Sequence, residues 1–179
     1  MTILIYIAIA LAAVIAIVLI LAAMRPDTFR VQRSIEINAP AEKIFPLIND
    51  YKNWGAWSPY EKVDPAMQRT FSGAPSGEGS VYEWRGNKGV GHGRMEIMDT
   101  TPLSKIVIKL DFFTPFEAHN TAEFTMLPKG SSVTNVTWAM HGPVTYVAKI
   151  IHTFMNMDRM CGDQFQQGLA SMKSVAESR

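Results

Sequence analysis

The sequence predicts an α+β fold in which a curved antiparallel sheet of about seven strands wraps around a long C-terminal helix, preceded by one N-terminal transmembrane helix. Three observations support this. Residues 2–24 are uncharged and almost entirely apolar, residues 29–141 contain alternating stretches separated by turn sequences, and residues 144–177 carry apolar residues at three- and four-residue steps. Only the terminal helix is long enough to cover the concave face of such a sheet.

The N-terminal apolar segment is long enough to cross a bilayer. A helix over Thr2 to Met24 rises ~1.5 Å per residue and spans the roughly 30 Å hydrocarbon core. The apolar core of a secretory signal peptide is usually about 7–15 residues long and follows basic residues, whereas this segment is longer and follows no Lys or Arg. We therefore expect residues 1–25 to be a retained anchor, with a cleaved signal or a buried soluble helix as the alternatives.

The charges that flank the anchor lie on its C-terminal side. Arg25, Arg30 and Arg33 follow it, with Asp27 among them, and positive residues tend to stay cytoplasmic. This predicts a single-pass protein of the inner or plasma membrane with its globular domain in the cytoplasm. The single cysteine, Cys161, cannot form an intrachain disulfide, so nothing in the chain requires an oxidising compartment.

The remaining chain, residues 26–179, has the size of one domain with one core. Its charge pattern argues against nucleic acid as a partner, because the net charge of the chain is +1 and there is no basic run. We expect the membrane and an apolar small molecule or lipid as partners instead. The sequence indicates no particular protein partner.

The elements are expected in the following order. Residues 29–37 alternate with period two and form a strand, and Asn38 then caps a short helix over residues 41–48. An aromatic loop over residues 51–60 follows. Further strands are expected at residues 67–71, 79–85, 90–98, 104–113, 116–126 and 131–141.

The last part of the chain, residues 144–177, is expected to be helical. Gly162 interrupts its apolar stripe and is expected to mark a kink or a break. The half before it, residues 144–160, is then a candidate lid with an apolar surface that can touch the bilayer.

Several stretches of the domain carry a family resemblance. Residues 34–45, Asp50 and residues 54–59 resemble the opening of the START-like, or SRPBCC, superfamily of Bet v 1-like proteins, polyketide cyclases and lipid-transport proteins. Residues 82–87, 91–95 and 165–169 resemble later signatures of a membrane-anchored bacterial branch. The resemblance implies a helix-grip fold with an internal cavity. It implies no single function, because the superfamily includes lipid carriers, hormone receptors, ring cyclases, hydroxylase domains and chaperone activators.

Residue types that commonly bind metals or catalyse reactions are scattered along the chain. The four histidines and Cys161 show no metal-ligand spacing, so we expect neither a metal nor an organic cofactor. The glycines of residues 89–93 do not fit a nucleotide-binding loop and are expected to bend a strand or to leave room for a side chain. Alternation places His119 and His141 on the outer face of the sheet. We predict no catalytic residue.

A few polar residues are expected to face the interior: Arg33, Arg69, Tyr82 and Asn120, with Glu83 if a bulge shifts the register. Each also has a purely structural interpretation. The arginines can extend to the rim, Tyr82 can be a core residue with its hydroxyl bonded, and Asn120 can bond the backbone.

The aromatic and methionine content predicts a pocket for a hydrophobic ligand. These residues exceed what a small core needs and make adaptable apolar walls, although each one alone is compatible with an ordinary core. The predicted ligand-binding residues are Trp54, Trp57, Tyr82, Trp84, Met95, Ile108, Leu110, Phe112, Asn120, Trp138, Phe154 and Met157.

Three functions follow from these features. The main hypothesis is a membrane-anchored binding protein for a lipid or another hydrophobic small molecule held in an internal cavity. The second is a cyclase- or hydratase-type enzyme in which Tyr82, Arg33 or Asn120 polarises the carbonyl of a hydrophobic substrate. The third is a protein-interaction module of the chaperone-activator kind, which a small and empty cavity would favour.

Overall fold

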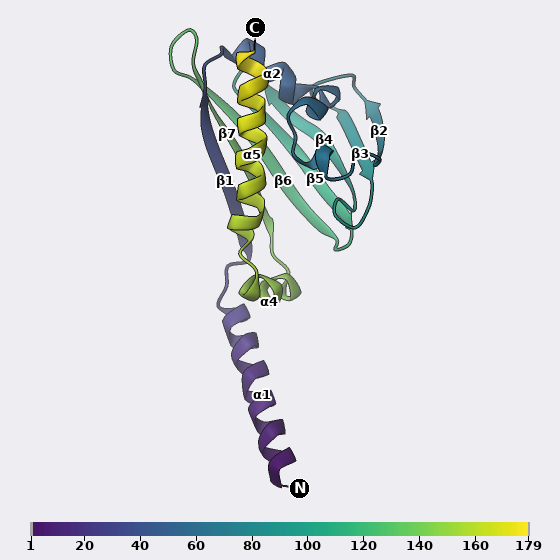
Figure 1. Cartoon of the computed structure of the whole chain (residues 1–179), viewed down its shortest axis with the longest axis vertical. Coiled ribbons are helices and arrows are strands. Elements are labelled where there is room, and N and C mark those ends of the chain that lie inside the picture. Colours follow the sequence, from purple (N-terminus) through teal and green to yellow (C-terminus); the bar gives the residue numbers. More distant parts are fainter. Residues whose placement is uncertain (1, 179) are drawn as a thin grey trace.

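The computed structural model describes residues 2–178, apart from the side chain of His152. Met1, which begins the expected anchor, and Arg179, which ends the expected domain, lie outside the described residues. Helix α1, Thr2–Ala23, projects away from the rest of the chain as a single rod (Figure 1). By length and composition it is able to span a membrane, a property that a signal sequence can share. Four residues then connect α1 to β1, so the expected boundary after residue 25 falls in this linker.

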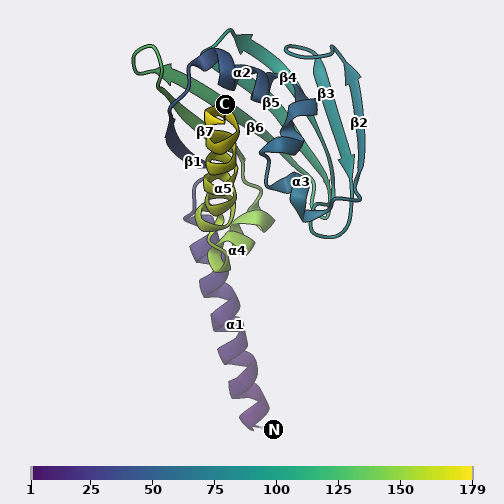
Figure 2. The same cartoon turned by 45° about the horizontal axis from the view of Figure 1, so that its top comes forward.

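The domain is built on one antiparallel sheet of 7 strands in the order β1-β7-β6-β5-β4-β3-β2. The sheet curves around the C-terminal helix, with the short helices covering the rest of its concave side (Figure 2). This confirms the predicted α+β helix-grip architecture. The strands are β1 (Thr28–Ile37), β2 (Gln68–Gly73), β3 (Ser80–Arg85), β4 (His92–Thr101), β5 (Lys105–Thr114), β6 (Ala118–Pro128) and β7 (Thr134–Pro143).

The register of the sheet follows the predicted alternation. In β5 and β6, Ile108 pairs with Ala122 and Ile106 with Phe124, and all four side chains are buried. Strand β4 carries register shifts at His92/Gly93 and at Ile97/Asp99, and Met98, which lies within the second shift, is exposed. A Cβ added at Gly93 would lie 2.3 Å from Cζ2 of Trp84, so this glycine leaves room for the indole ring, as expected.

Short helices connect β1 to β2: α2 (Ala41–Asn49), the 3₁₀ helix η1 (Tyr51–Ala56) and α3 (Tyr60–Val63). The predicted cap by Asn38 is wrong, because Pro40 occupies the N-cap position of α2 and makes no side-chain capping bond. The backbone N–H of Asn38 instead donates to Oε1 of Glu177 at 2.6 Å. This bond ties the start of α2 to the last turn of the C-terminal helix.

The terminal helical region consists of α4 (Tyr146–Phe154) and α5 (Met157–Glu177). The predicted break at Gly162 is wrong, since the break falls at Met155 and Asn156. The side chain of Asn156 caps α5 by accepting from the backbone N–H of Arg159 at 3.0 Å. Gly162 lies inside α5, where an added Cβ would stand 2.0 Å from Nη2 of Arg33. The glycine therefore serves close packing of α5 on β1 rather than flexibility.

Candidate ligand-binding site

Most of the predicted ligand-binding residues form the core between the sheet and α5. The ring of Trp138 stacks on Phe165 at 4.2 Å and on Phe124 at 5.0 Å, and Trp57 meets it edge-on at 5.5 Å. Trp57 and Ile108 are fully buried. The predicted residues that belong to this packed interior are Trp54, Trp57, Tyr82, Trp84, Met95, Ile108, Leu110 and Trp138, with Phe112 packed against it. Their predicted role in binding a ligand stays a prediction, and a ligand among them would have to separate side chains that now touch.

Three predicted residues lie outside this core. Phe154, at the end of α4, exposes 73% of its surface, and Met157 begins α5. Both line a pocket at the end of the domain that faces α1. Asn120 lines a different pocket beside the opening of β1. The interruption of the helix after Phe154 turns this residue away from the apolar stripe on which periodicity had placed it.

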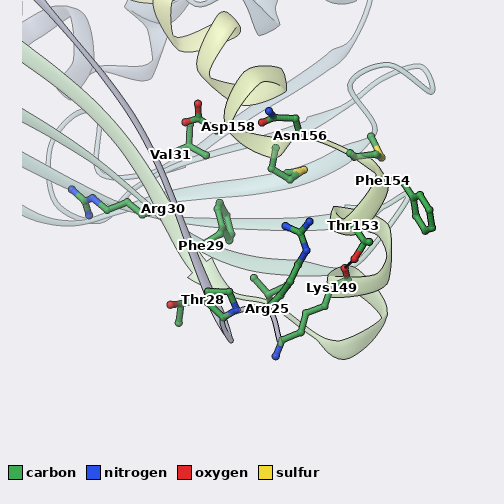
Figure 3. Close-up of a pocket in the computed structure, with 14 residues that line it drawn as sticks. Arg25, Thr28, Phe29, Arg30, Val31, Lys149, Thr153, Phe154, Asn156 and Asp158 are labelled. Atoms are coloured by element: carbon green, nitrogen blue, oxygen red, sulfur yellow. Dashed lines mark hydrogen bonds between the residues drawn. The ribbon is translucent and has the colours of Figure 1, made fainter. Parts of the chain in front are cut away.

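The pocket that contains Phe154 and Met157 is the one we consider the candidate site. It has a volume of about 520 Å³ and lies between the linker after α1, the opening of β1, the end of α4 and the start of α5 (Figure 3). Its walls combine apolar and polar side chains in equal number. The apolar lining consists of Pro26, Phe29, Val31, Val144, Phe154, Met155 and Met157, and the polar lining of Arg25, Thr28, Arg30, Lys149, Thr153, Asn156 and Asp158.

Lys149 fastens α4 to the linker. Its side chain is buried, and its ammonium group pairs with the carboxylate of Asp27. The backbone N–H of Val144 also donates to the carbonyl of Asp27 at 2.7 Å. The cation on the α4 side of the pocket is therefore neutralised within the protein.

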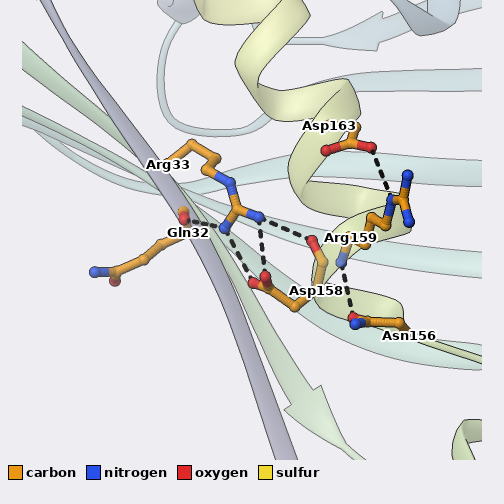
Figure 4. A network of polar contacts seen from close by, with 6 residues as sticks. All are labelled: Gln32, Arg33, Asn156, Asp158, Arg159 and Asp163. Atoms are coloured by element: carbon orange, nitrogen blue, oxygen red, sulfur yellow. Dashed lines mark hydrogen bonds and ion pairs between the residues drawn. The ribbon is translucent and has the colours of Figure 1, made fainter.

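Arg33 of β1 and Asp158 of α5 form a second ion pair, on the α5 side of the pocket. The two Nη atoms of Arg33 donate to the two carboxylate oxygens of Asp158 at 3.0 and 2.9 Å, and Nη2 also donates to the backbone carbonyl of Asp158 at 3.0 Å (Figure 4). The hydrogen bond from the guanidinium lowers the pKa of Asp158 and in turn raises the pKa of Arg33. Arg33 thus extends to the rim and joins β1 to α5, in agreement with its structural interpretation.

The other polar residues expected inside lie apart from this contact. Nε of Arg69 donates to Oε2 of Glu61 at 2.7 Å, and the hydroxyl of Tyr82 donates to Oε1 of the same carboxylate at 2.6 Å. Burial, followed by the bond to Glu61, raises the pKa of Tyr82. Glu83 faces His92, with 3.0 Å between Oε1 and Nε2. Arg33, Tyr82 and Asn120 therefore do not assemble into one catalytic group.

A second pocket of about 880 Å³, the one that Asn120 lines, lies beside β1, β6 and β7. His119 and His141 also line it, and the side chain of His119 is 59% exposed. Nδ1 of His119 lies 2.7 Å from Oδ1 of the buried Asp111, and Nζ of Lys109 lies 3.1 Å from Oδ2. The bond to Asp111 raises the pKa of His119. Within residues 2–178, leaving aside the side chain of His152, no group of three or more His, Cys, Asp or Glu is arranged to hold a metal ion.

Sequence reasoning missed the contribution of Arg25 and Lys149 to the first pocket. Arg25 served only to predict orientation, and Lys149 fell within an apolar helical face. Their closeness depends on how the linker folds back onto α4, a contact between residues 122 positions apart in the case of Lys149 and Asp27. The one available signal was that Arg25 directly follows an apolar segment and Lys149 stands within one.

Comparisons with known proteins agree with this architecture. The family model described as polyketide cyclase / dehydrase and lipid transport matches residues 28–177. A crystal structure of a Chromobacterium violaceum protein has a TM-score of 0.58 and 14% identity over 87% of this chain and 100% of that chain. No curated protein sequence matches the chain significantly.

Two plant proteins have a similar fold. A norcoclaurine synthase mutant from Thalictrum flavum, solved with a transition-state analogue, has a TM-score of 0.56 and 11% identity over 82% of this chain and 96% of that chain. The major latex-like protein 151 from Panax ginseng has a TM-score of 0.58 and 12% identity over 86% of this chain and 100% of that chain. At these identities the likeness concerns the fold alone.

Proposed function

Because this chain belongs to the polyketide cyclase, dehydrase and lipid-transport family, we propose that it is a membrane-anchored protein that binds a lipid or another hydrophobic small molecule beside the bilayer. The observation that carries the proposal is the position of the first pocket, which opens where α1 joins the domain. Its apolar side chains provide binding energy on the order of 25 cal/mol per Å² of apolar surface buried, and its polar groups fix the orientation of the ligand.

The anchor is the second part of the proposal. Helix α1 exposes apolar side chains along its length, as a lipid-facing helix does. The arginines after it favour a cytoplasmic domain, because positive residues tend to stay on that side of the membrane. The full chain should remain with membranes during alkaline carbonate extraction, and a reporter fused after Arg179 should report the cytoplasm. Release by carbonate would overturn the anchor, and an external reporter signal would overturn the orientation.

The ligand is tested by purifying the full chain in a mild detergent and analysing the extracted small molecules by mass spectrometry. We expect a lipid or another hydrophobic compound in near-stoichiometric amount. A Thr153→Trp variant is the matched control, because an indole at this lining position fills the pocket without changing its charge. The proposal fails if nothing is enriched over a detergent blank, or if the folded variant retains the same compound.

The enzyme hypothesis has less support. Tyr82 and Arg33 are already bonded to Glu61 and Asp158, and they lie at different places on the sheet. A group that polarises a carbonyl must be free to donate to the developing oxyanion. Binding without chemistry therefore accounts better for these side chains.

A further inference from the structure

Helix α4 is held against the end of α1. The hydroxyl of Tyr146 donates to the backbone carbonyl of Leu19 at 2.8 Å, and α1 and α4 pack on each other. Ala22 is fully buried although nearly all of α1 is exposed. Leu19 precedes the last residue of α1 by four positions, or about 6 Å along a helix that rises ~1.5 Å per residue. If α1 spans the membrane as proposed, α4 lies at the level where α1 leaves the bilayer.

The exposed surface of α4 and of the residue after it carries large apolar side chains. Val147 exposes 67% of its surface and Phe154 73%, and the adjoining Met155 exposes 45%. Large apolar side chains gathered on one short element are unusual on a water-facing surface. They fit the boundary between head groups and acyl chains, where amphipathic helices insert their apolar face. The leaflet that α1 enters is therefore the surface that covers α4.

The first pocket opens at the same level and contains one uncompensated cation. Lys149, Arg30 and Asp158 are each within ion-pair distance of an opposite charge, whereas the guanidinium of Arg25 has no ion-pair partner among residues 2–178. In Figure 3 the side chain of Arg25 extends up between Phe29 and Thr153, and that of Arg30 points away from it. A guanidinium beside apolar walls is well suited to an anion, and its planar fork matches the oxygens of a phosphate.

We infer that this pocket receives the phosphate head group of an anionic membrane lipid, with Arg25 as the cation that binds it. The acyl chains then run along Phe154 and Met155 back into the leaflet. This inference rests on the proposed function and specifies its ligand class. It predicts that head-group charge, and not only apolar surface, determines which lipids bind.

The test is native mass spectrometry of the full chain in detergent, with phosphatidylglycerol or phosphatidylcholine added at equal concentrations. Wild type should bind phosphatidylglycerol preferentially. Arg25→Gln should bind it about tenfold more weakly, the effect of losing one charge-assisted contact, and should lose the preference. Arg25→Lys should retain part of it. Arg159→Gln, on an exposed part of α5 outside the pocket, is the matched control and should behave as wild type.

Three outcomes separate the possible explanations. If Thr153→Trp retains the preference for phosphatidylglycerol, the lipid is held by general surface charge and the inference is overturned. If inorganic phosphate competes with the lipid as well as unlabelled phosphatidylglycerol does, the site is for free phosphate and the lipid assignment is wrong. If Thr153→Trp abolishes binding of both lipids but Arg25→Gln changes neither, the proposed function survives and only the head-group assignment fails.

Discussion

The interior beneath the sheet buries its apolar side chains, whereas the end of the domain that faces α1 exposes them. Beneath the sheet, aromatic rings such as Trp57, Phe124 and Trp138 contact one another and are nearly inaccessible. At the α1 end, Phe154 and Met155 are exposed beside an open pocket. Apolar content therefore stabilises one region and remains available for contacts in the other. The difference teaches that the same residue types indicate a core or a binding surface according to whether packing partners surround them.

The largest effect should come from Trp138→Ala. Its ring lies between Phe165 and Phe124, and it also occupies the space above Gly168, where an added Cβ would approach it to 2.8 Å. Removing a buried aromatic side chain of this size costs about 3–5 kcal/mol of unfolding free energy. Urea denaturation of the full chain in detergent measures it.

Phe154→Ala is the matched change at the α1 end. Because that ring is exposed, its loss should alter the unfolding free energy by no more than about 0.5 kcal/mol. Equal losses in the two variants would contradict the distinction between a packed interior and an available surface. A folded variant at position 138 with weakened lipid binding would favour the predicted internal site over the pocket at the α1 end.

The contact between α5 and β1 should give an intermediate effect. Gly162→Ala places a methyl group against the guanidinium of Arg33 and should destabilise the chain by about 1 kcal/mol, at the low end for overpacking because the guanidinium can move. In an Arg33→Ala background the same change should instead stabilise by up to ~1 kcal/mol, since alanine favours the helix more than glycine does. A double-mutant cycle measures this reversal. Stabilisation by Gly162→Ala alone would show that the glycine has no packing role.

The smallest effect should be a pH dependence at the second pocket. Hydrogen bonding to Asp111, with Glu117 nearby, raises the pKa of His119 above its unfolded value of about 6.5. The associated stability is complete below that pH and is lost as the pH rises through the folded pKa. The melting temperature should fall by no more than about 2 °C as the pH rises through the folded pKa of His119, because its imidazole is exposed to solvent. His119→Gln should remove the fall and His141→Gln should leave it; a fall that persists in His119→Gln would exclude this group.

The sequence predicts the strands and the helix-grip arrangement well because period-two alternation and turn residues are local signals. The inward direction of Ile106, Ile108 and Trp138 follows from the same alternation. The end of α4 was harder to predict, because Asn156 starts a new helix through one side-chain cap within a continuous apolar pattern. The role of Gly162 depends on Arg33, which is distant in sequence, and composition cannot reveal such a contact. The first pocket depends on the same kind of long-range contact, between Lys149 and Asp27.

The central claim, that the α1 end of the domain lies at the membrane, is tested most directly by measuring depth in a bilayer. A fluorescent probe is attached to Phe154→Cys or to Ser131→Cys in the full chain, in a Cys161→Ser background, and the protein is reconstituted into vesicles that contain a lipid-borne quencher. Ser131 lies in the exposed loop between β6 and β7, at the opposite end of the sheet from α4. We expect strong quenching at position 154 and little at position 131. Equal and weak quenching at both positions would contradict the account.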